Sequence, residues 1–185
     1  MAFVKSVPAE GEAVGTVVGR FPDSAIPLTE MTEVLMRTGD CRFSPEEREL
    51  IAAYVSGTNS CTFCYDTHRA TAETFGVDAG LLEALLGDLE SAPVDEAFKP
   101  VLRFARKLTL TPSKMVQADA DAIFDAGWDE ASFHYTVMIT ALFNLYNRVM
   151  DGYGVRNTPE FRQERGEWLA KSGYAWVIER FRQKS

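Results

Sequence analysis

Hydrophobic residues recur at helical spacing along most of the chain, and no segment alternates between apolar and polar residues as a strand would. The pattern predicts an all-α, single-domain bundle of about seven to nine helices over residues 21–185, with a loose, glycine-containing segment at residues 1–20. The predicted helices cover 26–38, 44–56, 61–75, 79–87, 94–110, 113–126 and 129–153, followed by a final pair over 158–183.

Local signals mark several helix ends. Ser44 precedes Pro45 and stands three residues before Glu47, which is the spacing of a capping box. We expect Gly39 and Gly57 to end the helices before them. Ser60 and Asp78 are expected to cap the helices that follow them, as short polar side chains commonly do.

Composition narrows the possible functions. The 185 residues are 46% hydrophobic and carry a net charge of −8, which disfavours binding to nucleic acid or to an anionic membrane surface. The first twenty residues lack the apolar run of a signal peptide, and the most apolar stretch, 135–150, is too short and polar to span a bilayer. We therefore expect a cytoplasmic protein with reduced thiols.

The chemistry of the chain concentrates in the stretch NSCTFCYDTHRA, residues 59–70. On a helix, Cys61, Cys64 and His68 share one face, each one turn from the next. A helix N-terminus and a nearby histidine both favour the reactive thiolate form of cysteine. The spacing therefore indicates a redox dithiol with its own proton acceptor.

Two other readings of the cysteines stay open. A zinc site would need a fourth ligand from Cys41, Glu49 or His134, none of which has a typical ligand spacing. The pair could also be two accidental buried cysteines. A thioredoxin-type fold is disfavoured because a predicted helix, not a strand, precedes the motif.

The segment FSPEERELIAAYVSGTNSCTFCYDTH resembles the signature of the alkylhydroperoxidase D-like proteins within the carboxymuconolactone decarboxylase superfamily. Glu49 stands twelve residues before Cys61, and C-x-x-C-x-x-x-H follows. The segments RFARKLT and ALFNLYNRVMDGYGV are similar to parts of its peroxidase-related branch.

This resemblance implies a helical homo-oligomer (dimer, trimer or hexamer). We expect no cofactor, and no metal because only three of the four usual zinc ligands are close in sequence. The implied substrate is a hydroperoxide, and the implied reductant is an external dithiol or a thioredoxin-like or lipoyl partner. Carried over to this chain, Cys64 attacks the peroxide and Cys61 resolves the product. Glu49 and His68 form the proton relay.

The chain departs from the best-studied members at Phe63, where they have a second histidine. A weak internal similarity at an offset of 85 residues aligns His134 with Glu49, so His134 is a candidate replacement; the alternative is a core histidine facing a carbonyl. We expect Phe63 and Tyr65 to shape an apolar pocket beside the thiols. Asn144, with the neighbouring Asn147 and Arg148, is expected to brace the active-site loop or a subunit contact.

Two functional alternatives remain at this level. The dithiol could serve a redox sensor or disulfide reductase without peroxidase turnover. The scaffold could instead carry a lactone decarboxylase-like activity, although that chemistry does not require the intact Cys-x-x-Cys.

Overall fold

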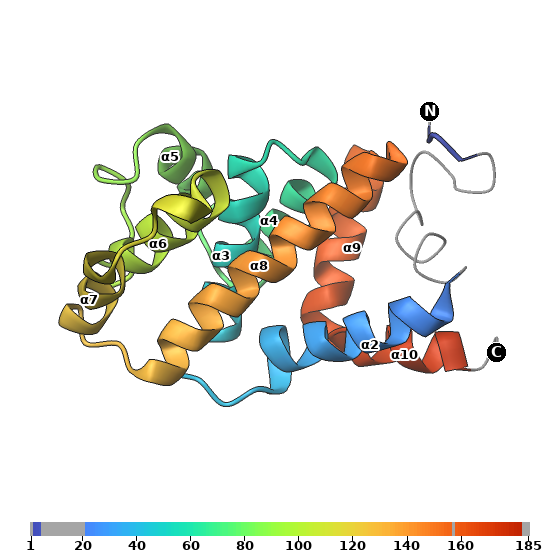
Figure 1. The fold of residues 1–185 in the computed structure, drawn as a ribbon. Coiled ribbons are helices and arrows are strands. Elements are labelled where there is room, and N and C mark those ends of the chain that lie inside the picture. Colours follow the sequence, from blue (N-terminus) through green and yellow to red (C-terminus); the bar gives the residue numbers. More distant parts are fainter. Residues whose placement is uncertain (1, 5–20, 157, 183–185) are drawn as a thin grey trace.

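The computed structural model describes residues 2–4, 21–156 and 158–182. Within these ranges the chain forms nine α-helices, a π-helical turn and a 3₁₀ turn, and no strand, so the predicted all-α class is confirmed (Figure 1). Of the predicted loose segment, residues 5–20 lie outside the described residues. None of the described helices is long and apolar enough to cross a membrane.

The first helix of the described chain ends in a π-helical turn. Helix α2 (Pro22–Glu33) continues directly into the π-helical turn η1 (Val34–Thr38), and Gly39 ends it as predicted. The loop that follows is held by the buried guanidinium of Arg48, which donates to the carbonyls of Leu35, Gly39 and Phe43. These three bonds fix the path of η1 over the core.

Helices α3 (Pro45–Thr58) and α4 (Thr62–Thr74) form a hairpin at the centre of the molecule (Figure 1). The predicted capping box begins α3: the Ser44 hydroxyl accepts from the Glu47 N–H, and the Glu47 carboxylate accepts from the Ser44 N–H. Residues 48–56 of α3 are all buried, so this helix is surrounded by the rest of the fold. A polar group within residues 48–56 is therefore shielded from bulk water.

The remaining helices surround this hairpin. They are α5 (Leu81–Gly87), α6 (Lys99–Leu110), η2 (Pro112–Lys114), α7 (Gln117–Asp125), α8 (Glu130–Tyr153), α9 (Pro159–Ser172) and α10 (Ala175–Arg182). The long α8 crosses the molecule from the α7 end to the α9 end (Figure 1). Helix α9 packs closely on α4, because a Cβ at Gly166 would lie only 2.5 Å from the Cβ of Ala70.

Three predicted helix ends are wrong in detail. Helix α3 continues past Gly57 to Thr58. Ser60 does not cap α4, because it adopts a left-handed conformation (φ 58°) and Cys61 takes the N-cap position. Asp78 contributes its backbone carbonyl to the Leu81 N–H, and Gly80 is the N-cap of α5.

Buried apolar side chains gather in two clusters. The larger one is formed mainly by α3, α6 and α8, with Ile51, Leu102 and Ile139 among its fully buried members. The smaller cluster lies between the start of α4 and the end of α8. It contains Cys61, Phe63, Cys64, Met150 and Val155.

Candidate functional site

The turn between α3 and α4 presents the cysteine pair. The Cys61 N–H donates to the carbonyl of Ser56, and the Ser60 N–H donates to the carbonyl of Gly57. With Ser60 left-handed, this is the geometry that normally ends a helix on glycine. The reversal places Cys61 at the N-cap of α4, with Cys64 in its first turn.

Both thiols are free and buried. Cys61 is 0% exposed and Cys64 is 4% exposed, and Phe63 lies in the same buried cluster. A hydrogen bond from the Cys64 thiol, helped by the Cys64 backbone N–H, lowers the pKa of Cys61 although burial opposes ionisation. The same bond, together with burial, raises the pKa of Cys64 well above its usual value. The pair therefore favours a thiolate on Cys61 and a protonated Cys64.

Asparagine side chains brace this turn from α8. The Asn59 amide donates to the side-chain oxygens of Asn144 (3.1 Å) and Asn147 (2.8 Å). The buried Asn147 amide donates in turn to the hydroxyl of Ser56 at 3.0 Å. Asn144 thus helps to hold the turn that carries the cysteine pair, and it is not part of the cysteine cluster.

A cavity of about 330 Å³ opens beside the same turn. Asn59, Asn147, Arg148 and Asp151 line it. The Cys61 sulfur lies 3.8 Å from the backbone carbonyl oxygen of Asn147, one of the residues that line the cavity. The Cys64 thiol interacts with the side chain of the same residue.

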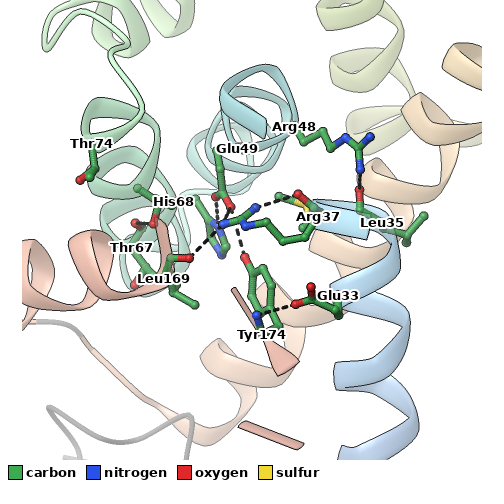
Figure 2. A network of polar contacts seen from close by, with 12 residues as sticks. Glu33, Leu35, Arg37, Arg48, Glu49, Thr67, His68, Thr74, Leu169 and Tyr174 are labelled. Atoms are coloured by element: carbon green, nitrogen blue, oxygen red, sulfur yellow. Dashed lines mark hydrogen bonds and ion pairs between the residues drawn. The ribbon is translucent and has the colours of Figure 1, made fainter. Parts of the chain in front are cut away.

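A buried contact between His68 and Glu49 lies one turn further along α4. The Nδ1 atom of His68 is 2.6 Å from Oε2 of Glu49, which is fully buried on α3 (Figure 2). The His68 ring also packs edge-on against Phe143, with centroids 4.4 Å apart. Because Nδ1 bonds the carboxylate, Nε2 is the ring nitrogen left for proton exchange.

Two residues that the sequence analysis missed complete the surroundings of Glu49. Nη2 of Arg37, on η1, lies 2.7 Å from Oε1 of Glu49, and the Tyr174 hydroxyl donates to the same oxygen at 3.4 Å (Figure 2). Burial opposes ionisation of Glu49, but the charges and hydrogen bonds of His68 and Arg37 outweigh it and lower the pKa of the carboxyl. Glu49 is therefore a buried carboxylate held by the Arg37 guanidinium and by the His68 ring.

Tyr174 is itself fixed by a second acid. Its backbone N–H, and that of Ala175, donate to Oε2 of Glu33 at 2.6 and 3.0 Å. Arg37 also donates to the carbonyl of Leu169 and stacks against the Tyr174 ring. The beginning and the end of the described fold thus meet at Glu49.

We expected His68 to lower the pKa of Cys64, and the structure does not bear this out. His68 is bonded to Glu49, whereas the thiol of Cys64 interacts with Cys61 and the Asn147 side chain. The pKa of Cys64 is raised, not lowered, because its hydrogen bond to Cys61 and its burial both favour the protonated thiol. His68 remains one helical turn from Cys64, but it does not make Cys64 the more acidic thiol.

Two candidate pocket residues lie elsewhere. His134 is exposed near the start of α8, about 20 Å along the helix from Asn147, so it neither replaces a relay histidine nor lies in the core. Tyr65 packs against the larger core cluster and Gly57, not among the thiols. Sequence proximity to the cysteines was misleading because neighbouring helical residues point in different directions.

The third cysteine stands apart from the pair. Cys41 is half-buried, and its sulfur accepts from the Phe43 N–H at 3.3 Å. Within the described ranges, no three His, Cys, Asp or Glu side chains converge to hold a metal ion.

Known proteins are similar to this chain in sequence and in fold. Residues 22–107 match the carboxymuconolactone decarboxylase family. The uncharacterized protein YdfG of Bacillus subtilis is 30% identical over 109 residues, which cover 59% of this chain and 74% of that protein.

Two solved structures extend the similarity to most of the chain. An uncharacterized peroxidase-related protein from Silicibacter sp. TM1040 superposes with a TM-score of 0.74 at 27% identity, covering 81% of this chain and 78% of that one. A protein from Ralstonia eutropha JMP134, described as an alkylhydroperoxidase AhpD core, gives 0.73 at 24% identity, covering 82% and 79%, and shares the fold. The resemblance found in the sequence is confirmed: the chain belongs to the carboxymuconolactone decarboxylase family and has the alkylhydroperoxidase D-like fold.

Proposed function

We propose that the protein is a dithiol-dependent hydroperoxide reductase in which Cys61 and Cys64 cycle between dithiol and disulfide. The observation that carries this proposal is the arrangement of the pair itself. Two free thiols lie one turn apart at the start of α4, they interact with each other, and the pKa of one falls while that of the other rises. Reactive dithiols have this asymmetry, because one sulfur must be a thiolate while the other still holds its proton.

In the proposed reaction the Cys61 thiolate attacks the terminal oxygen of the hydroperoxide. The O–O bond breaks, Cys61 becomes a sulfenic acid, and the alkoxide takes up a proton and leaves as the alcohol. The Cys64 sulfur then attacks the Cys61 sulfur, water leaves, and a disulfide forms. An external dithiol restores both thiols by exchange and is itself oxidised to a disulfide.

This order is the reverse of the one that the family resemblance implies. The two thiols both contact Asn147, but only Cys61 has a lowered pKa, and this suits the attacking sulfur. Cys64 must lose its proton in the second step, and His68 lies one turn further along the same helix. We assign the Glu49–His68 pair to that proton transfer, with the ionised Glu49 holding the imidazole by Nδ1.

The partners of this reaction are proposals of the same kind. The substrate is a hydroperoxide, and the reductant is a small dithiol or a thioredoxin-like or lipoyl protein. We further propose a homo-oligomer, because the outer side of α8 leaves Leu145 42% exposed and Leu110 at the end of α6 is 54% exposed. Light scattering that gives a mass of 20.6 kDa would contradict this assembly.

Steady-state kinetics test the activity. We expect purified protein to consume tert-butyl hydroperoxide only when dihydrolipoamide is supplied. Cys61→Ser and Cys64→Ser should each abolish turnover, whereas Cys41→Ser, outside the pair, should retain it. Turnover that survives loss of both paired cysteines would contradict the proposal.

A redox sensor is the second candidate, favoured by the nearly complete burial of both thiols. Such a protein would form the Cys61–Cys64 disulfide with one equivalent of peroxide but would not turn over with excess peroxide and dithiol. The same kinetic experiment separates the two functions. A lactone decarboxylase-like activity would be recognised by its survival in the Cys61→Ser and Cys64→Ser variants.

A further inference from the structure

Asp151 lies where a proton acceptor for Cys61 would be needed. In an α-helix, the carbonyl of residue i accepts from the N–H of residue i+4, so the carbonyl of Asn147 points along the helix towards residue 151. The Cys61 sulfur lies 3.8 Å from that carbonyl oxygen. The thiol therefore approaches α8 at the turn that carries Asp151.

The cavity described above connects this carboxylate to the solvent. Asp151 and Arg148 line it together with Asn59 and Asn147. The Asp151 side chain is 41% exposed, and its ion pair with the exposed Arg156, at 3.3 Å, is of the weak surface kind. The carboxylate is thus free to exchange its partner for a proton or a substrate oxygen.

We propose that Asp151 is a catalytic acid–base residue for Cys61, and that the hydroperoxide reaches the buried Cys61 sulfur from the side of the cavity that Asp151 lines. This inference rests on the proposed function. The Asp151 carboxylate takes the proton of the Cys61 thiol, and the thiolate attacks the terminal oxygen of the hydroperoxide. The carboxylic acid then gives the same proton to the departing alkoxide. A thiol and a hydroperoxide become a sulfenic acid and an alcohol, and Asp151 ends as a carboxylate.

The electrostatics of the site support this role. The hydrogen bond from Cys64 lowers the pKa of Cys61, whereas the negative charge of Asp151 raises it. This charge acts on Cys64 in the same direction. Other charged and titratable groups lie around Cys61 and Asp151. They are Cys64 on α4, Tyr146, Arg148 and Tyr153 on α8, Arg156 after α8, and Arg165 on α9. The guanidinium of Arg165 lies over the Phe63 ring.

Two possible roles of Asp151 predict different effects of its removal on the reaction rates of Cys61. If Asp151 only adds negative charge, Asp151→Asn makes Cys61 a better thiolate and speeds all of its reactions. If Asp151 also carries the proton, the variant gains thiolate but loses the acid that protonates the alkoxide. Alkylation needs only the thiolate, whereas peroxide reduction needs both.

The experiment therefore measures both reactions on the same reduced, full-length chain. The rate of iodoacetamide addition to Cys61 is followed by mass spectrometry from pH 5 to 9, and disulfide formation with tert-butyl hydroperoxide is followed by rapid quench. We expect Asp151→Asn to move the alkylation profile to lower pH and to slow peroxide reduction by about 10²-fold, which is the usual size of an acid–base contribution. Asp151→Glu should recover much of the peroxide rate.

Asp125→Asn, an exposed change on α7 at the other end of α8, is the matched control and should alter neither reaction. The inference is overturned if Asp151→Asn changes both rates in the same direction or leaves peroxide reduction unchanged. If the wild-type protein itself does not reduce hydroperoxides, the proposed function fails and the inference fails with it. Alkylation of the wild type at Cys61 would still proceed, so the two failures are distinguishable.

Discussion

Nη2 of Arg37 lies 2.7 Å from Oε1 of Glu49, and the two side chains are 11% and 0% exposed. The contact joins the π-helical turn η1 to the middle of α3, two elements that meet only through the tertiary fold. On its other oxygen, Glu49 bonds His68. The buried carboxylate is thus held by the Arg37 guanidinium on one oxygen and by the His68 ring on the other.

Removal of Arg37 should be strongly destabilising. In Arg37→Leu, Glu49 would remain buried with only His68 and the longer Tyr174 bond as partners, and breaking a buried pair in this way typically costs about 3–5 kcal/mol. Urea denaturation at pH 7 gives the change in the free energy of unfolding. Arg162→Leu is the control, since its longer 3.6 Å pair with Asp66 lies at the surface, with side chains 42% and 28% exposed, and should be worth less than about 1 kcal/mol. Equal losses in both variants would contradict the buried-pair interpretation.

The lowered pKa of Glu49 predicts a specific pH dependence. The carboxyl ionises more readily in the folded protein than in the unfolded chain, where its pKa is about 4.3. Its contribution to stability is therefore complete above the unfolded pKa and is lost as the pH falls through the folded pKa. We expect Glu49→Gln to be less stable than the wild type at pH 7, with the difference shrinking below about pH 4. Denaturation curves between pH 7 and 3 measure it, and a difference independent of pH would refute the assignment.

The sequence predicts the local features of this site better than its long-range ones. The capping box of α3 and the shared face of Cys61, Cys64 and His68 follow from spacing within one or two helices. Arg37 and Tyr174 lie 12 and 125 residues from Glu49, and no spacing rule connects them. The order of the two thiol pKa values likewise depends on burial and on a hydrogen bond that the motif does not specify.

Ser60 shows how a local rule can fail. The residue before Cys61 reads as a helix cap, but its backbone is left-handed, a conformation that costs a non-glycine residue about 1–2 kcal/mol. Ser60→Gly should therefore stabilise the fold by about 0.5–1 kcal/mol after the added flexibility of the unfolded chain is counted. Gly127→Ala is the converse control, because φ is 91° and the space is open, so only backbone strain is added. Thermal unfolding of the two variants should shift in opposite directions.

The two histidines should differ sharply in importance. His68→Ala removes the group next to Glu49 and is expected to slow the formation of the Cys61–Cys64 disulfide by about 10²-fold at pH 7. His134→Ala changes an exposed residue at the far end of α8 and should leave the rate as in the wild type. Rapid quench after mixing with hydroperoxide gives both rates. A slow His134→Ala variant would restore that residue as a relay candidate.

The order of attack is decided by trapping the first oxidised sulfur. Cys64→Ser keeps a hydroxyl that can still donate to Cys61, so the Cys61 thiolate should react once with peroxide and accumulate as a sulfenic acid. A dimedone-type probe followed by mass spectrometry should then label Cys61. In Cys61→Ser, the remaining thiol is buried and its pKa stays high because burial persists, so little label should appear on Cys64. Faster labelling of Cys64 in Cys61→Ser than of Cys61 in Cys64→Ser would instead support the order implied by the family resemblance. In that case the proton relay from Glu49 through His68 would act on the attacking thiol and not on the resolving one.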